Sequence, residues 1–418
     1  MTQEVASASP TGQDMTDVVN ALLTGGVQDP YPLYAQLREA GDGVHWSDVL
    51  KGHLVTRYTQ VRQIAGDHET FSSDVFWGMA ASDHDPSDAE HLRFIDIASR
   101  LFMFADPPTH TRIRSTFRHV FTPATVMNWE GMVSQVAKEL LERHPRGEEL
   151  DIMPGFAADV PVAVIAEVLG VPAGMRPRFR EWSYAYASTF DPIVQGEQRA
   201  RAISTSLELF DYLASLVRER KESPRADLIS ELVRTETIDG DVLGDIELLA
   251  QIALLLVAGN ETTTTLIGTG LTLLFDHPEV LAAIRTDRSL LPAAIEEMLR
   301  IDPPLHFIVR QATKDVVVGE HQLPAGSLIW GCVPAANRDP RRFTMPDQFD
   351  IHREDNKHLS FMHGIHFCVG APLARLEGRV VFNHILDNYP DIRAGEEAPR
   401  RRVTNIIARG FESRPVVL

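Results

Sequence analysis

The sequence predicts a mainly α-helical protein with small β-sheets. Helical patterns follow one another from residue 123 to residue 236, and a longer apolar pattern covers residues 241–276. Short runs of β-branched and aromatic residues, which favour strands, occur toward both ends of the chain. A length of 418 residues allows two or three domains, but no repeat or low-complexity tract divides the chain, and 44% hydrophobic residues suffice for a large core.

Composition limits the partners and the compartment. The chain has 58 acidic and 40 basic residues, a net charge of −18, which disfavours nucleic acid as a partner. Two cysteines, Cys332 and Cys368, cannot build a disulfide framework. Because the use of one cysteine as a metal ligand implies a reducing compartment, we expect a cytoplasmic protein.

The N-terminal residues and the apolar runs predict no membrane anchor. Residues 1–28 are interpreted as a flexible N-terminal tail, and residues 1–17 lack the basic-then-apolar order of a signal peptide. The longest nearly uninterrupted apolar run, residues 248–258, is roughly half of the ~20 residues that a membrane-spanning helix needs.

Local patterns predict the elements that open the folded part. Residues 31–40 predict a helix with prolines near its start, residues 44–56 a short hairpin, and residues 58–65 a helix that Gly66 ends. Residues 71–104 show no period, although they hold many large apolar side chains beside an acidic run. We interpret this segment as a lid over an apolar pocket, with plain core packing as the alternative.

Helical spacing dominates the rest of the chain. A helix follows Pro108, and further ones are predicted over residues 126–143, 156–169, 176–188, 200–220, 227–235, 291–301 and 373–386. Residues 305–309 predict a strand.

Cys368 lies between Gly364 and Gly370, just before the last predicted helix. Backbone N–H groups and the positive end of a helix lower the pKa of a thiol and stabilise a metal-bound thiolate. A zinc site with His363 and His366 is one alternative, and a buried structural cysteine is another.

The central helix over residues 241–276 contains an unusual stretch, Ala258-Gly259-Asn260-Glu261-Thr262-Thr263-Thr264-Thr265. Glycine and threonine are weak helix formers, so the hydrogen-bond ladder is expected to loosen here. A carboxylate beside an alcohol in an apolar helix indicates a partner or a function, because burying an unpaired charge is costly. The alternative is that one helix ends at Gly259 and a second begins at Asn260, a residue expected to face either pocket or solvent.

Two pairs of charged residues at helical spacing are further candidates for functional residues. His110 and Arg114 are four residues apart, and two such cations repel unless they share an anion; a solvated basic face is the alternative. Glu297 and Arg300 are three residues apart, and a surface salt bridge is the simpler interpretation of that pair alone.

These motifs together resemble the cytochrome P450 family. The pattern Phe361-x-x-Gly364-x-His366-x-Cys368-x-Gly370 is similar to its haem-thiolate motif, and residues 258–263 match its Ala/Gly-Gly-x-Asp/Glu-Thr-Thr motif. The resemblance covers residues 29–418 and implies a single large domain, mainly helical, with small sheets on one side. It also implies haem b, iron protoporphyrin IX, with Cys368 as the axial ligand of the iron.

The resemblance assigns roles to further residues. Glu261 and Thr262 would be the acid and alcohol that deliver protons, and Glu297, Arg300 and Arg353 a structural cluster that braces the core. Four of the predicted haem-binding residues would be cations at the propionates: His110, Arg114, Arg310 and His366. The other predicted haem-binding residues are Ala258, Gly259, Phe361, Gly364 and Gly370.

The function implied by the resemblance is a monooxygenase that inserts one oxygen atom of O2 into a lipophilic small molecule. The chain has no flavin, dinucleotide or iron–sulfur motif, so electrons would come from a ferredoxin or flavodoxin with an NAD(P)H reductase. Basic residues such as His110, Arg112, Arg114, Arg118 and Arg375 could dock this partner. We expect a monomer.

Two other functions stay open at this point. One is a haem-thiolate enzyme that uses peroxide or inserts no oxygen, which the intact Glu261-Thr262 pair disfavours. The other is a haem carrier or gas sensor that has no substrate.

Overall fold

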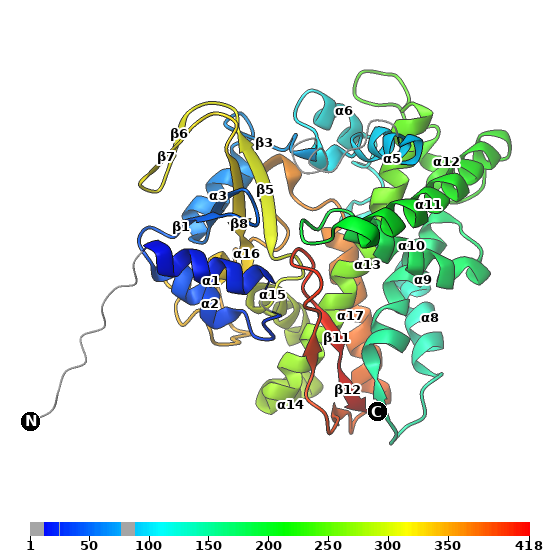
Figure 1. Cartoon of the computed structure of the whole chain (residues 1–418). Helices are drawn as coiled ribbons and strands as arrows, with labels where there is room; N and C mark the ends of the chain where they lie inside the picture. The colour runs from blue at the N-terminus through cyan, green and yellow to red at the C-terminus, as the bar shows by residue number, and fades with distance from the viewer. Residues whose placement is uncertain (1–11, 25, 77–87) are drawn as a thin grey trace, which may run out of the picture.

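The computed structural model describes residues 12–24, 26–76 and 88–418. A helical region lies on one side and a smaller region, which contains the main sheet, on the other, with helices α13, α15 and α17 between them (Figure 1). This arrangement agrees with the predicted mainly helical fold with small sheets.

The helices of eight or more residues are α1 (Gly12–Thr24), α2 (Tyr31–Glu39), α3 (Tyr58–Gly66), α5 (Ala89–Ala98), α8 (Glu130–Leu141), α9 (Asp159–Leu169), α10 (Arg176–Ser188), α11 (Gly196–Glu222), α13 (Asp245–Asp276), α14 (Pro278–Thr286), α15 (Leu291–Ile301) and α17 (Ala371–Asn388). Shorter ones are α6 (Thr109–Ser115), α7 (Pro123–Met127), α12 (Leu228–Leu232) and α16 (Val333–Asn337). The predictions for α10 and α15 are confirmed to the residue.

The strands form one larger sheet and three small ones. They are β1 (Val44–Ser47), β2 (Gly52–Val55), β3 (Phe71–Ser72), β4 (Glu149–Asp151), β5 (Phe307–Ala312), β6 (Val316–Val318), β7 (His321–Leu323), β8 (Leu328–Cys332), β9 (Arg393–Ala394), β10 (Arg400–Arg401), β11 (Phe411–Ser413) and β12 (Pro415–Val417). The five-stranded sheet has the order β1-β2-β8-β5-β3. Its β1–β2 pair, with Val44 opposite Val55, is the predicted hairpin.

The predicted tail over residues 1–28 is wrong for residues 12–24, which form helix α1. Met15, Val19, Leu22 and Leu23 of this helix are at most 4% exposed and belong to a core cluster with residues of α2 and β8. The polar residues between them hide this apolar face in the sequence, because they lie on its outer side.

The segment 71–104 is also more regular than predicted. Residues 89–98 form α5, whose N-terminus is capped by the Asp88 carboxylate, which accepts hydrogen bonds from the N–H groups of Glu90 and His91. Phe94 and Phe104 are buried in the main core. Part of the predicted lid, including Trp77, lies outside the described residues.

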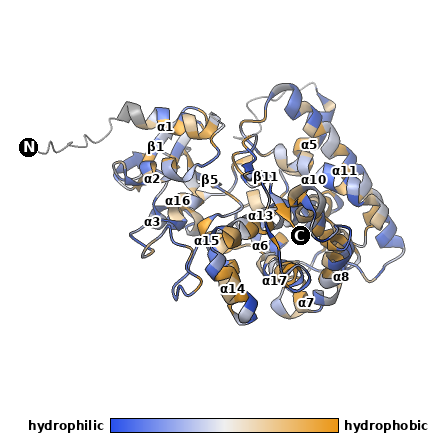
Figure 2. Cartoon of the chain, turned by 90° about the horizontal axis from the view of Figure 1, so that it is seen from below, coloured by the Kyte–Doolittle hydropathy of each residue, from blue (hydrophilic) through white to orange (hydrophobic). Residues whose placement is uncertain are grey.

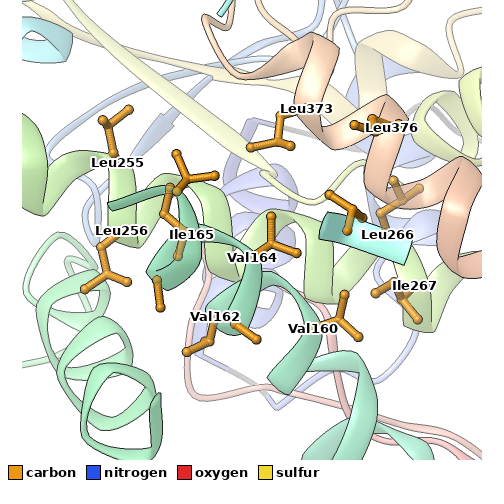
Figure 3. Packing of buried hydrophobic residues seen from close by; sticks show 14 of the residues in the cluster. Val160, Val162, Val164, Ile165, Leu255, Leu256, Leu266, Ile267, Leu373 and Leu376 are labelled. Carbon is orange, nitrogen blue, oxygen red and sulfur yellow. The ribbon is translucent and has the colours of Figure 1, made fainter. Parts of the chain in front are cut away.

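Helix α13 runs through the main core without interruption, so neither the expected loosening nor a helix end at Gly259 occurs. The Thr262 hydroxyl donates to the Ala258 carbonyl at 2.8 Å, within the intact helix. Side chains of α9, such as Val164 and Ile165, pack against α13, as do Leu373 and Leu376 of α17 (Figure 3).

Hydrophobic residues gather where α13 and α17 lie, whereas hydrophilic ones occupy the periphery (Figure 2). Helix α13 is long and apolar enough to meet the length and composition of a membrane span, but 67% of its most apolar window is buried inside the fold. Its hydrophobicity is therefore that of a core helix.

A buried ion-pair cluster holds the region between α15 and the segment that precedes the cysteine motif. The Glu297 carboxylate accepts two hydrogen bonds from Arg300, both at 2.7 Å, and one from Arg353 at 3.2 Å. Arg300 also donates to the carbonyls of Asn337 and Gln348, both at 2.9 Å. Glu297 and Arg300 are 0% exposed, which excludes a surface salt bridge.

Removal of the charge of Arg300 should destabilise the protein severely. In Arg300→Met, the Glu297 carboxylate stays buried without its main partner, so we expect a loss of about 3–5 kcal/mol in the free energy of unfolding. Urea unfolding followed by circular dichroism measures this loss.

A suitable control is Arg201→Met, because Arg201 and its partner Glu197 are 74% and 81% exposed. This control should unfold close to the wild type, since exposed ion pairs contribute little. Equal stabilities of the two variants would contradict the assignment of Arg300 as a structural residue.

Candidate functional site

Cys368 lies between a short 3-10 turn, Gly364–His366, and the first residue of α17. Its N–H donates to the Phe361 carbonyl at 2.9 Å, which closes the loop. Burial raises the pKa of the Cys368 thiol, whereas the N–H groups of Gly370 and Ala371 and the charge of Arg114 act in the opposite direction. A thiol in this position ionises readily only when a further cation, such as a metal ion, stabilises the sulfur.

Gly364 and Phe361 fix the loop around the cysteine. Gly364 has φ +75°, and a Cβ there would lie 2.9 Å from the Cα of Gly66 on α3, so only glycine fits. The Phe361 side chain is 7% exposed, and the Arg375 guanidinium lies 4.4 Å from its ring centroid. A Cβ on Gly370 would lie 3.9 Å from the Cys368 sulfur, so this glycine keeps the surroundings of the sulfur open.

A cavity of about 460 Å³ brings the cysteine together with two predicted cations from a distant part of the chain. Its lining includes Cys368 and Phe367 from the cysteine loop, and His110, Arg114 and Arg118 from α6 and the turns after it. The Arg114 guanidinium donates a hydrogen bond to the Phe367 carbonyl. Segments more than 250 residues apart thus form one site.

The predicted cations form a cluster without an ion-pair partner among the described residues, and the charge of Asp106 only partly opposes the lowering of the pKa of His110 and Arg310. The rings of His110 and His366 are 4.4 Å apart, and the Nε2 of His366 lies 2.8 Å from the hydroxyl oxygen of Ser73. Neither ring nitrogen of His110, which is 2% exposed, meets a hydrogen-bond partner among the described residues. Arg310 on β5 is 6% exposed and donates to the Val309 carbonyl at 2.7 Å, but it forms no ion pair within the described chain.

The pKa values of these cations are consistent with a binding site for an anion between them. Burial and the charge of Arg114 lower the pKa of His110 to about 4, burial and the charge of Arg310 lower that of His366 to about 2, and burial lowers that of Arg310 to about 10. Groups that resist protonation for these reasons are stabilised by an anion among them. The two propionates of a haem would provide such an anion, so these residues fit the cofactor.

Two alternatives from the sequence fail. Among the residues that the structure describes, no three His, Cys, Asp or Glu side chains gather to hold a metal ion, which excludes the zinc site. His363 instead packs against α3, where a Cβ on Gly66 would lie 2.8 Å from its ring. His110 is buried, so it lies neither on a solvated basic face nor on a docking surface.

One face of α13 opens in the middle of the core. Ala258 is exposed and Val257, Gly259 and Thr262 are half-buried, although the helix on either side is buried. A Cβ on Gly259 would touch Ile165 of α9 only at 4.0 Å. Small residues at this point leave space beside the helix for a large planar group.

Glu261 has a partner that sequence patterns did not indicate. The Nη1 of Arg402, in the loop that joins β10 and β11, lies 3.0 and 2.9 Å from the two carboxylate oxygens of Glu261. Burial raises the pKa of Glu261, and Arg402 opposes this shift. In the described structure no hydrogen bond joins Glu261 to Thr262, so the predicted acid–alcohol pair is adjacent in sequence but not in direct contact.

Asn260 faces neither pocket nor solvent, contrary to both expectations. It is 0% exposed, and its side-chain amide donates to the hydroxyl of Ser183 on α10 at 2.9 Å. A buried amide needs such a partner, and helix α10 provides it.

Comparisons with known proteins agree on one family. Residues 78–400 match the family model described as Cytochrome P450. The chain is 36% identical to Cytochrome P450 107B1 of Saccharopolyspora erythraea, over 93% of this chain and 95% of that protein. It is 36% identical to the cytochrome P450 monooxygenase PikC of Streptomyces venezuelae, over 99% and 96%. The crystal structure of P450BioI, in complex with an acyl carrier protein that carries hexadec-9Z-enoic acid, superposes with a TM-score of 0.85 at 29% identity, over 93% of this chain and 98% of that chain.

Proposed function

Because this chain belongs to the cytochrome P450 family of haem-dependent monooxygenases, we propose that the Cys368 thiolate binds the haem iron. The cavity that Cys368 shares with His110 and Arg114 is the main observation that supports this proposal. When bound, the haem activates O2, so that one oxygen atom is inserted into a substrate, and a thiolate ligand favours cleavage of the O–O bond.

The residues around the cysteine hold the cofactor in one orientation. His110, Arg114, Arg310 and His366 bind the propionates by charge-assisted hydrogen bonds, which offset the cost of their own burial. Phe361 excludes water from the sulfur, and low polarity around a metal ligand helps to set the redox potential. Ala258 and Gly259 leave room for the porphyrin beside α13.

Glu261 and Thr262 supply protons. The Thr262 hydroxyl lies on the open face of α13, and its bond to the Ala258 carbonyl fixes its orientation. Glu261 is the acid that renews these protons, from the buried position where Arg402 holds its carboxylate. Both are proton-transfer groups, and burial raises the pKa of Glu261, which favours a carboxyl in this role.

The proposed substrate is a lipophilic natural product. Relatives of the chain include 6-deoxyerythronolide B hydroxylase of Saccharopolyspora erythraea and cyclomarin C epoxidase of Salinispora arenicola. The half-buried Val257 and Val309 pack against the main core, which supports an apolar substrate.

Electrons come from a ferredoxin or flavodoxin with its NAD(P)H reductase. The partner is acidic and docks on the cysteine side, where Arg118 is exposed at the rim of the cavity. Arg112 and Arg375 contribute less, because Arg112 forms an ion pair with Glu247 and Arg375 one with Glu296.

The cysteine assignment is tested with Cys368→His. The purified, haem-loaded variant should lose the long-wavelength Soret band of the reduced carbon monoxide complex, since that band requires a thiolate ligand. The control is Cys332→Ala, which removes a cysteine that is 0% exposed and is expected to keep the band. Survival of the band in Cys368→His would remove this residue as the ligand.

The substrate class is tested by the spin-state shift of the Soret band. The panel contains 6-deoxyerythronolide B, cyclomarin C, vitamin D3, testosterone and hexadec-9Z-enoic acid, compounds named with relatives or structural neighbours. We expect a macrocycle to give the largest shift. Largest shifts with the fatty acid or the steroid would instead assign a linear or a fused-ring substrate.

The alcohol assignment is tested with Thr262→Ala and the panel compound that gives the largest shift. NAD(P)H consumption should continue while product per NAD(P)H falls about tenfold and hydrogen peroxide rises, because positioned proton donors contribute ~10²-fold or more.

Thr272→Ala is the matched control. The Thr272 hydroxyl donates to the Gly268 carbonyl at 2.9 Å, the same type of bond on the same helix but away from the site. Equal coupling of oxygen to product in the two variants would exclude proton delivery by Thr262.

A further inference from the structure

Helix α15 carries two neighbouring carboxylates that have different partners. Glu297 belongs to the buried cluster with Arg300 and Arg353, whereas Glu296 pairs with Arg375 of α17, the helix that follows the cysteine. The Nε and Nη2 atoms of Arg375 donate to the two oxygens of Glu296 at 2.7 and 2.8 Å. Two parallel hydrogen bonds of this kind fix both the position and the plane of a guanidinium group.

His358 holds the other side of the Glu296 carboxylate. Its side chain is 3% exposed, and its Nε2 lies 3.4 Å from an oxygen of Glu296. Its Nδ1 accepts a hydrogen bond from the Ser360 N–H at 3.2 Å, so the neutral ring carries its proton on Nε2, which can donate to Glu296. Burial alone raises the pKa of Glu296, but the hydrogen bonds from Arg375 and His358 lower it to about 2. The carboxylate therefore stays charged and keeps Arg375 in place.

The guanidinium of Arg375 faces the cysteine loop. It lies 4.4 Å from the ring centroid of Phe361, within the range of a cation–π contact. The Phe361 carbonyl accepts the hydrogen bond from the Cys368 N–H, so one residue both contacts the cation and closes the loop around the sulfur. Burial raises the pKa of the Cys368 thiol, and the charges of Arg114 and Arg375 are among the effects that oppose this shift. The ion pair of Glu296 and Arg375 is thus oriented with its positive end toward the sulfur.

The sign of this charge determines its effect on an electron that enters the site. A positive charge near a metal-bound thiolate favours the state that holds one electron more, because its Coulomb energy with the more negative state is lower. The Arg375 side chain is 41% exposed, so solvent weakens this interaction without removing it.

We propose that Arg375, held by Glu296 and His358, raises the reduction potential of the haem by keeping its charge beside the Cys368 sulfur. Arg375 is a positioning residue in this role, because it acts on the iron only through the ligand. The inference rests on the proposed binding of the haem iron by Cys368. The step concerned transfers one electron from the external ferredoxin or flavodoxin to the ferric haem, and no covalent bond forms or breaks.

The proposal is tested by redox titration of the haem-loaded protein without substrate or electron-transfer partner. Dithionite and soluble mediators set the potential, and the absorbance of the haem gives the ratio of reduced to oxidised protein. Arg375→Met removes the charge at a similar side-chain length. At the midpoint potential of the wild type, this variant should show a ratio about tenfold lower, which corresponds to ~59 mV for a one-electron couple.

Arg379→Met is the matched control. Arg379 lies one turn further along α17 and pairs with Glu130 at 2.9 Å. These two side chains are 32% and 38% exposed, close to the 41% and 29% of Arg375 and Glu296. The ratio in Arg379→Met should stay within threefold of the wild type. A ratio in Arg375→Met that is not lowered at least threefold, or an equal decrease in the two variants, would overturn the proposal.

Arg375→Lys separates the charge from the packing over Phe361. Lysine keeps the charge but lacks the planar group, so the ratio should return to within threefold of the wild type. A ratio as low as that of Arg375→Met would overturn the proposal, because packing would then be the cause. In every variant the long-wavelength Soret band of the reduced carbon monoxide complex verifies the thiolate ligand. Should Arg375→Met lack this band, Arg375→Gln replaces it with the same expectation.

These titrations depend neither on turnover nor on the docking of a partner. Persistence of the long-wavelength band in Cys368→His would refute the cysteine ligand on which the inference rests. Loss of the band in that variant, together with equal ratios in the wild type and Arg375→Met, would refute only the role of Arg375.

Discussion

The packing of α13 is the constraint on which the rest of this protein depends. The helix is buried on nearly every side, between α9 and α17, and still leaves space along part of one face. Ala258 and Gly259 create that space with small side chains while the backbone stays helical. The Thr262 hydroxyl is satisfied within the helix, so the opening introduces a polar group without an unpaired donor.

Buried charge has two opposite forms in this molecule. In the cluster of Glu297, Arg300 and Arg353, carboxylate and guanidinium groups satisfy each other and nearby carbonyls, which gives a rigid support. In the described chain, His110 has no hydrogen-bond partner, and Arg310 has the Val309 carbonyl but no carboxylate in an ion pair. Since an unpaired buried charge is costly, the first arrangement is complete as folded, whereas the second is suited to an anionic ligand.

The sequence predicted features whose determinants are local. Helices α10 and α15 and the β1–β2 hairpin have their stop residues and their periods within a few positions, and their predictions hold. The prediction failed for α1, whose narrow apolar face is recognisable only against its partners in α2 and β8. It also failed for α5, where an acidic N-cap resembles part of an acidic loop.

The residues of the site likewise fall into those that the sequence predicted and those that it did not. The residues near Cys368 and the pair of His110 and Arg114 could be named from short motifs. Arg402 could not, because it lies 141 residues after Glu261 and no spacing connects them. The need for a partner was foreseeable, since a carboxylate in an apolar helix requires one, but only the fold identifies which cation comes into reach.

The contact between Gly364 and Gly66 has a consequence for evolution within the fold. It joins the cysteine loop to α3, which packs against β8 of the main sheet, so the sulfur is positioned by the sheet-containing region. Helices α10 and α11 belong to the other region and make no contribution to that joint. Substitutions in them can therefore change the cavity that α10 and α11 line while the geometry of the cysteine loop is inherited unchanged.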